Sequence, residues 1–147
     1  MSEMVWVRSH VERLLQDEWS VCRVEADRDG DYPFRNGTAA CWVRLIDAGE
    51  PLVRVFAHAA CGVRRSVKLL TELNDIQNRA LTTSVMLTDG CVVIAQTVSA
   101  YELSCVVLGQ AMAAVGGLAD EVGVLLAGMF GGSTPLPAEV PEPEEAE

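Results

Sequence analysis

Two runs of β-branched residues separated by Asp89-Gly90 constrain the fold of this chain more than any other feature. The runs are residues 82–88 and 91–98, and an Asp-Gly pair supplies the positive φ angles that a two-residue hairpin turn needs. Residues 66–78, which come shortly before, place apolar side chains three and four positions apart. That spacing is the period of an amphipathic helix with one buried stripe. The sequence therefore predicts a helix followed by a β-hairpin.

Two further helices are predicted outside this stretch. Residues 3–19 carry apolar side chains at helical spacing, and residues 101–130 follow a roughly helical period. The second segment is rich in glycine, which lowers helix propensity, so a break is expected near Gly116-Gly117. Its apolar part is shorter than the ~20 residues that a bilayer requires, and Gln110 interrupts it. No membrane-spanning segment is therefore predicted.

Three more strands complete the predicted order, and they are residues 20–24, 38–46 and 52–60. The last two are joined by a short turn and are predicted to form a hairpin. Neither face of the 52–60 strand is uniformly polar, so both faces can be partly covered. With the helices, the order is α-β-β-β-α-β-β-α. The prediction is an α+β domain in which helices pack on a five-stranded, largely antiparallel sheet.

The composition favours one folded domain with an acidic tail. The chain has 147 residues, half of them hydrophobic, which is enough for a real core. Its net charge of −10 argues against nucleic-acid binding and against docking on an anionic membrane. No N-terminal signal peptide is recognisable, so a cytoplasmic protein is expected. Residues 131–147 are rich in proline and glutamate, and they are expected to form a disordered tail after a domain of residues 1–130.

No metal, cofactor or catalytic site is predicted. The loop at residues 25–36 spaces its acidic side chains like a calcium loop, but Asn36 stands where a bidentate glutamate is required, so an acidic turn is expected. Neither His10 nor His58 is judged to lie at ligand spacing from a cysteine. Without paired carboxylates or a phosphate loop, an enzyme is not expected. The odd cysteine count and the absence of a C-x-x-C motif favour buried, reduced thiols at Cys22, Cys41, Cys61, Cys91 and Cys105.

The order of elements and the segment 53–98 resemble the YbjN-like family, which shares its fold with type III secretion chaperones. The resemblance covers residues 3–130. It rests on a strand ending near Ala57, a helix with Leu73-Asn74 near its end, and an Asp-Gly hairpin that leads into Val92-Val93. It implies a small, acidic, cytoplasmic, often dimeric protein without enzyme activity. The secretion-chaperone relatives hold an extended segment of a partner protein.

The predicted function is therefore that of a chaperone-like module that binds an extended segment of a client protein. The alternative is a regulatory or structural protein that acts only through its own dimer. An exposed strand edge and apolar pockets are expected to hold the client. The candidate pocket residues are Trp42, Val43, Leu45, Val53, Val55 and Phe56, for each of which packing under the helices is the alternative. A homodimer is expected, because the small-residue stretch 109–117 and the apolar helix 67–76 offer more apolar surface than one five-stranded sheet needs. The resemblance implies that the 66–78 helix contributes to the interface, with candidate interface residues Val67, Leu70, Leu73 and Asn74.

Overall fold

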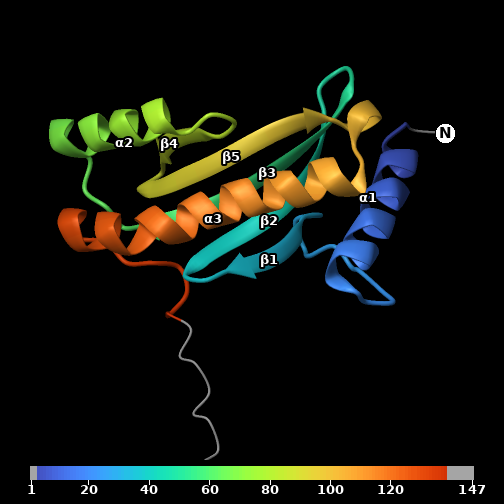
Figure 1. Ribbon diagram of the computed structural model, residues 1–147, viewed down its shortest axis with the longest axis horizontal. Helices are drawn as coiled ribbons and strands as arrows, with labels where there is room; N and C mark the ends of the chain where they lie inside the picture. The colour runs from blue at the N-terminus through green and yellow to red at the C-terminus, as the bar shows by residue number, and fades with distance from the viewer. Residues whose placement is uncertain (1–2, 139–147) are drawn as a thin grey trace, which may run out of the picture.

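The computed structural model describes residues 3–138 as one antiparallel sheet with helices packed against it (Figure 1). The elements in chain order are α1 (Glu3–Trp19), β1 (Tyr32–Asn36), β2 (Ala39–Asp47), β3 (Pro51–Cys61), α2 (Val67–Arg79), β4 (Ser84–Thr88), β5 (Cys91–Ser99), the short 3-10 helix η1 (Ala100–Glu102) and α3 (Cys105–Phe130). The sheet has five strands in the order β1-β2-β3-β5-β4, and every neighbouring pair is antiparallel. The predicted α+β architecture is confirmed.

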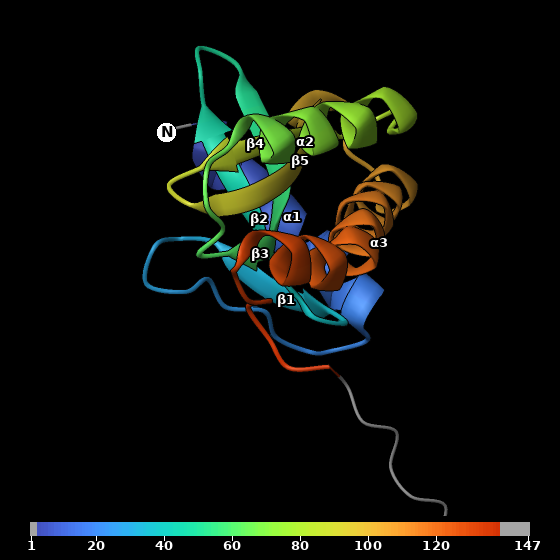
Figure 2. The same ribbon diagram turned by 90° about the vertical axis from the view of Figure 1, so that its left-hand side faces the viewer.

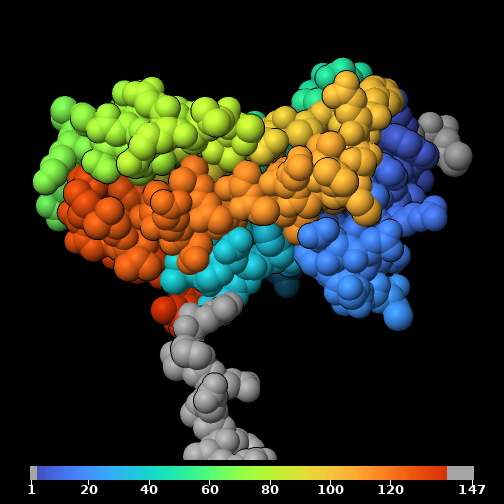
Figure 3. Space-filling view, in the orientation of Figure 1, coloured from blue at the N-terminus to red at the C-terminus, as the bar shows by residue number. Residues whose placement is uncertain are grey.

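The helices cover one face and one end of the sheet. α3 runs across the middle of the sheet and α2 lies beside it over β4, so that their side chains form much of the surface in the space-filling view (Figure 3). α1 crosses one end of the sheet (Figure 1). Seen from the side, α3 stands on one side of the strands, and no described helix covers the other side (Figure 2). The sheet therefore has one closed face and one largely open face.

The first strand differs from the prediction. Residues 20–24 form no strand, and Ser20 adopts a left-handed conformation (φ 53°) directly after the end of α1. The strand that occupies this place in the order is Tyr32–Asn36, inside the segment expected to be a turn. The acidic turn is confined to the residues before it, where the Asp27 carboxylate accepts hydrogen bonds of 2.9 Å from the N–H groups of Asp29 and Asp31. Such a turn is typical of aspartate, whose side chain can replace a backbone acceptor.

α3 is continuous from Cys105 to Phe130, so the predicted break at Gly116-Gly117 is wrong. The reason is close packing on the sheet. A Cβ atom at Gly123 would lie 2.4 Å from the carbonyl oxygen of Ala59 in β3, and one at Gly116 would lie 2.8 Å from the side chain of Asn36. The tertiary contact outweighs the low helix propensity of glycine, which costs about 1 kcal/mol per residue. By length and composition alone α3 could cross a bilayer, but here its buried side chains form the centre of the core.

The contact at Gly123 leads to a testable prediction. Gly123→Ala is expected to destabilise the protein by about 1–3 kcal/mol, because the added methyl group meets a backbone carbonyl that cannot move aside. Gly117→Ala is the matched control in the same helix, since a Cβ there meets nothing within 4 Å. It is expected to stabilise by roughly 0.5–1 kcal/mol. Urea unfolding followed by circular dichroism measures both, and equal effects at the two positions would contradict the close approach of α3 to β3.

The chain continues in contact with the sheet beyond α3. Gly131 ends the helix in a left-handed conformation (φ 76°), and Ser133 then forms an isolated bridge with Cys61. Leu136 donates its N–H to the carbonyl of Thr38 over 3.1 Å. The predicted disordered tail begins at residue 131, but residues 131–138 belong to the described part of the chain and include these contacts with the sheet. Residues 139–147 of that tail lie outside the described part of the chain.

Candidate functional site

The open face of the sheet is the candidate functional site. Strand pairing aligns side chains from β2, β3 and β5 in rows across this face. They alternate along each strand with fully buried residues such as Val43 and Val55, which face the helices. The three central rows are Ala40-His58-Val93, Trp42-Phe56-Ala95 and Arg44-Arg54-Thr97.

A hollow of about 500 Å³ lies over these rows. Its walls come from β2, β3, β4 and β5 and from the turn before β1. The apolar part of the lining is Trp42, Phe56, Met86, Val93 and Ala95, and the charged part is Asp29, Asp31, Arg44 and Arg54. An apolar floor with a few charged groups at its margin is typical of a surface that binds a ligand or a peptide.

An aromatic cluster forms the floor of the hollow. The rings of Trp42 and Phe56 stack with centroids 5.3 Å apart and an interplanar angle of 20°. His58 meets Trp42 edge-on at 4.9 Å, and the guanidinium of Arg44 lies 4.7 Å from the centre of the Phe56 ring. All three rings are half-buried, and burial lowers the pKa of His58 below its ordinary value. Because each ring is held by its neighbours, the cluster presents a fixed apolar surface to solvent.

The charges beside the cluster are also positioned. Arg44 donates to both carboxylate oxygens of Asp31, with Nε to Oδ1 at 3.0 Å and Nη2 to Oδ2 at 2.8 Å. The Asp31 side chain is buried, and its hydrogen bonds raise the pKa of Arg44 further above its usual value. Arg54 donates to the Thr97 hydroxyl over 3.0 Å and is exposed. The hollow thus has one arginine held against a carboxylate and a second that presents its charge to solvent.

The six candidate pocket residues lie on opposite faces of the sheet. Trp42 and Phe56 are in the open hollow. Val43, Val53 and Val55 are fully buried on the helix side. Leu45 shares that side and packs against the core. These four therefore cannot line an exposed pocket, because successive residues of a strand point to opposite faces. His58, Met86 and Val93 also line the hollow, and they were not among the predicted pocket residues because only the strand register brings them there.

The candidate interface residues of α2 also differ in exposure, because one of the four is buried in the core. Leu73 is 4% exposed and lies in the core with Leu69 and Ile76. Val67 is 83% exposed and Leu70 41% exposed. Asn74 is exposed as well. The outer side of α2 therefore carries Val67, Leu70 and Asn74 without Leu73.

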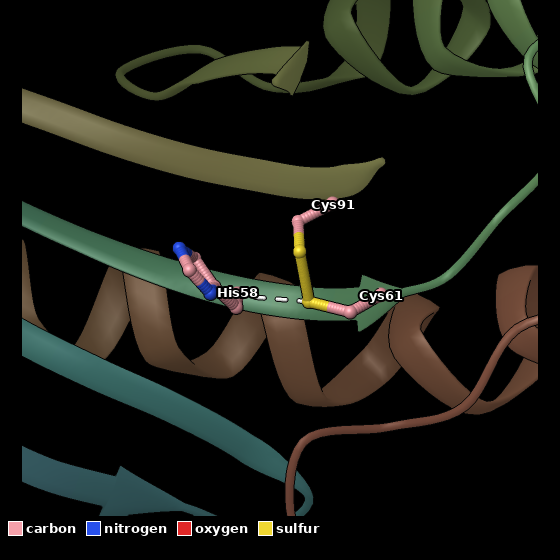
Figure 4. The surroundings of a disulfide bond; sticks show 3 residues. All are labelled: His58, Cys61 and Cys91. Atoms are coloured by element: carbon pink, nitrogen blue, oxygen red, sulfur yellow. Dashed lines mark hydrogen bonds between the residues drawn. A yellow bond between two sulfur atoms is a disulfide. The ribbon is translucent and has the colours of Figure 1, made fainter. Parts of the chain in front are cut away.

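The cysteines differ from the prediction of five buried, reduced thiols. Cys61 and Cys91 form a disulfide between β3 and β5 (Figure 4), and Cys22 and Cys105 are exposed. Only Cys41 is a buried thiol, and its burial raises its pKa to about 11. His58 Nδ1 lies 3.9 Å from Cys61 Sγ. The expectation that no histidine lies at ligand spacing from a cysteine is therefore wrong. The spacing His58-x-x-Cys61 could not by itself reveal the contact, because residues three apart in a regular strand point to opposite faces.

Comparison with known proteins identifies relatives of the fold. Residues 5–138 match the family model TY-Chap1, described as T3SS (YopN, CesT) and YbjN peptide-binding chaperone 1. A chain of the ExsC–ExsE complex superposes with a TM-score of 0.63 at 16% identity, covering 81% of this chain and 95% of that one. A chain of the HopA1–SchA chaperone–effector complex gives 0.59 at 15% identity, covering 82% and 97%. YbjN from E. coli gives 0.52 at 18% identity, covering 77% and 89%. No curated protein matches the chain.

Proposed function

Because the chain belongs to the TY-Chap1 family of T3SS and YbjN peptide-binding chaperones, we propose that it binds an extended segment of a client protein on the open face of its sheet. The observation that carries this proposal is the half-exposed aromatic cluster of Trp42, Phe56 and His58 in a hollow that no described helix covers. The HopA1–SchA structure, which has the same fold, is a chaperone–effector complex. The proposed role requires no enzyme activity.

The chemistry of the hollow supports a particular kind of client segment. A large apolar or aromatic client side chain packs on the stacked rings of Trp42 and Phe56, which are already ordered and so lose little entropy on binding. An acidic client side chain nearby pairs with the exposed Arg54. An extended segment suits this arrangement, because every second side chain can reach the floor while the others remain in solvent.

The sheet edges support binding on the face more than the addition of a new strand. Both edge strands, β1 and β4, are short. Pro33 in β1 supplies no backbone N–H. In β4 the Val85 N–H already donates to Gln77 Oε1 over 2.7 Å. Edges blunted in these ways are poor templates for strand addition, so side chains on the open face carry most of the proposed recognition.

We further propose that the protein acts in the cytoplasm as a homodimer formed through the outer side of α2, in keeping with its family resemblance. The exposed residues Val67, Leu70 and Asn74 lie on a helix that packs on the closed face of the sheet. Exposed apolar side chains of α3 extend the available surface, namely Val124, Leu125 and Met129. Such a two-fold interface would leave the open face of each protomer free for its client.

The test is the substitution Trp42→Ala in the full chain. A client is first captured by pull-down and identified by mass spectrometry, and its binding segment is then titrated against each variant. Trp42→Ala is expected to weaken binding by ~2 kcal/mol, roughly 30-fold, because the anchor surface is lost. The free energy of unfolding should change by only about 1 kcal/mol, since Trp42 is half-buried and packs on the surface cluster.

Trp6→Ala is the matched control, because Trp6 is 52% exposed on α1, outside the hollow. Client binding by this variant should equal that of the unsubstituted protein. Equal weakening by Trp6→Ala and Trp42→Ala would place the client elsewhere. A loss of ~3–5 kcal/mol of folding stability in Trp42→Ala, with normal binding by the folded fraction, would make Trp42 a core residue and refute its anchor role.

A further inference from the structure

We propose that His58, Cys61 and Cys91 form a binding site for one Zn²⁺ ion when the disulfide between the two cysteines is reduced. The site lies at one end of the open face, where β3 ends at Cys61 and β5 begins at Cys91 (Figure 4). Its three donor atoms lie within 4.8 Å of one another. The proposal does not rest on client binding, because it is argued from the chemistry of these side chains, but the two proposed sites share His58.

A β-bulge brings His58 and Cys61 to the same face. Residues three apart in a regular strand point to opposite faces. The pairing of β3 with β5 shifts between His58 and Ala60, so that the alternation is reversed before Cys61. Figure 4 shows the His58 ring directed toward the sulfur of Cys61. Bulges recur beside functional sites, because they re-aim a side chain in this way.

The backbone holds the two cysteines opposite each other independently of the disulfide. Cys61 and Cys91 are direct partners in the register of β3 and β5, with Cα atoms 4.0 Å apart. Cys61 also exchanges two hydrogen bonds with Ser133, at 2.8 and 2.9 Å. On the other side of the pair, Val63 donates to the carbonyl of Gly90 over 3.2 Å. Reduction therefore leaves two thiols facing each other on a fixed sheet.

The distances suit a tetrahedral zinc ion. With Zn–S bonds of about 2.3 Å and a Zn–N bond of about 2.0–2.1 Å, tetrahedral geometry separates sulfur from nitrogen by about 3.6 Å and the two sulfurs by about 3.8 Å. His58 Nδ1 already lies 3.9 Å from Cys61 Sγ. After reduction, rotation about the Cα–Cβ bonds of the cysteines separates the two sulfurs. One imidazole and two thiolates are a donor set that favours zinc over magnesium or calcium.

A dithiol can reduce the disulfide so that Zn²⁺ can bind. The reductant supplies two electrons and two protons, breaks the Cys61–Cys91 bond and is itself oxidised to a disulfide. Zn²⁺ then displaces the two thiol protons and binds both sulfurs together with His58 Nδ1. The fourth coordination position remains for water, as in zinc sites with three protein ligands. Because Trp42 lies 4.9 Å from His58, metal binding should also alter the fluorescence of the aromatic cluster.

The experiment uses the full chain carrying Cys22→Ser and Cys105→Ser, which removes the two exposed thiols. The protein is reduced with a phosphine and titrated with Co²⁺ as a spectroscopic probe, followed by Zn²⁺. One Co²⁺ per chain is expected, with the visible absorption of a tetrahedral site and sulfur-to-cobalt charge transfer. Zn²⁺ should displace the probe, and the oxidised protein should bind neither ion.

Further variants test the three ligands. Cys61→Ser and Cys91→Ser should each lose the charge-transfer absorption. His58→Gln should weaken metal binding at least ~10-fold, because removing a residue that only supports a metal ligand already lowers metal affinity by ~10–100-fold. His10→Gln, the other histidine, should bind as the parent does. Zn²⁺ should raise the Tm of the reduced parent by more than it raises that of His58→Gln, which keeps both cysteines. Absent cobalt absorption in the reduced parent, or absorption that persists in Cys61→Ser or in the oxidised protein, would overturn the proposal.

Discussion

Tyr32→Ala is expected to lower the free energy of unfolding by about 3–5 kcal/mol, the usual cost of removing a buried aromatic side chain. Tyr32 is 0% exposed and is the largest fully buried side chain of the core. Its hydroxyl donates to Glu12 Oε1 over 2.7 Å and accepts from Arg8 Nη1 over 2.7 Å. Burial, followed by the hydrogen bond to Glu12, raises its pKa to about 12. The residue therefore joins β1 to α1 through packing and hydrogen bonds together.

Val21→Ala is the control for this prediction, because Val21 lies in the segment where the sequence favours a first strand. It is 44% exposed in irregular structure, and its truncation should change stability by less than about 0.5 kcal/mol. Urea unfolding monitored by circular dichroism gives both values. A large loss for Val21→Ala with a small one for Tyr32→Ala would mean that the first strand is residues 20–24 after all.

The first strand could not be predicted from local sequence. Residues 20–24 contain two valines and resemble a strand, whereas Tyr32–Asn36 includes a proline and an asparagine, which are poor strand formers. β1 is an edge strand, so its pairing with β2 and the packing of Tyr32 against α1 decide its conformation. Tertiary contacts override propensity most easily in such short edge segments.

The central elements were predictable because each has a strong local signal. α2 has one buried stripe of Leu69, Leu73 and Ile76 and a cap at Ser66, whose hydroxyl accepts from Leu69 N–H over 3.0 Å. The hairpin turns at Asp89, whose φ is 49°, and at Gly90, whose φ is 78°. In both elements the local pattern and the tertiary packing favour the same conformation, which makes a sequence-based assignment reliable.

The site was less predictable, for reasons of register. The mixed polarity of the β3 faces correctly indicated that both carry apolar side chains, but it could not say which face the helices cover. The disulfide and its neighbour His58 depend on the bulge between His58 and Ala60 and on the pairing of Cys61 with Cys91. Neither the bulge nor the pairing of Cys61 with Cys91 can be predicted from residue spacing alone. Only the folded sheet brings these three side chains together.

The two faces of β3 lead to the largest expected difference between neighbouring substitutions. Val55→Asp is expected to cost about 4 kcal/mol or more, because it places a carboxylate beside Val43 on the fully buried side of the sheet, where apolar side chains surround it. A loss of this size approaches the whole stability of a small domain, so this variant should be largely unfolded.

Phe56→Asp is the matched control, since it introduces the same residue into the next position of the same strand. The shared strand-propensity cost of aspartate cancels in the comparison. Phe56 is half-buried, and its loss removes the ring stacking with Trp42 and the contact with Arg44, for about 1–2 kcal/mol. This variant should remain folded and yet lose the proposed client binding, because its carboxylate would lie beside Trp42 on the open face. Circular dichroism and urea unfolding of both variants show which face of β3 is buried. A folded Val55→Asp beside an unfolded Phe56→Asp would reverse the assignment of the two faces.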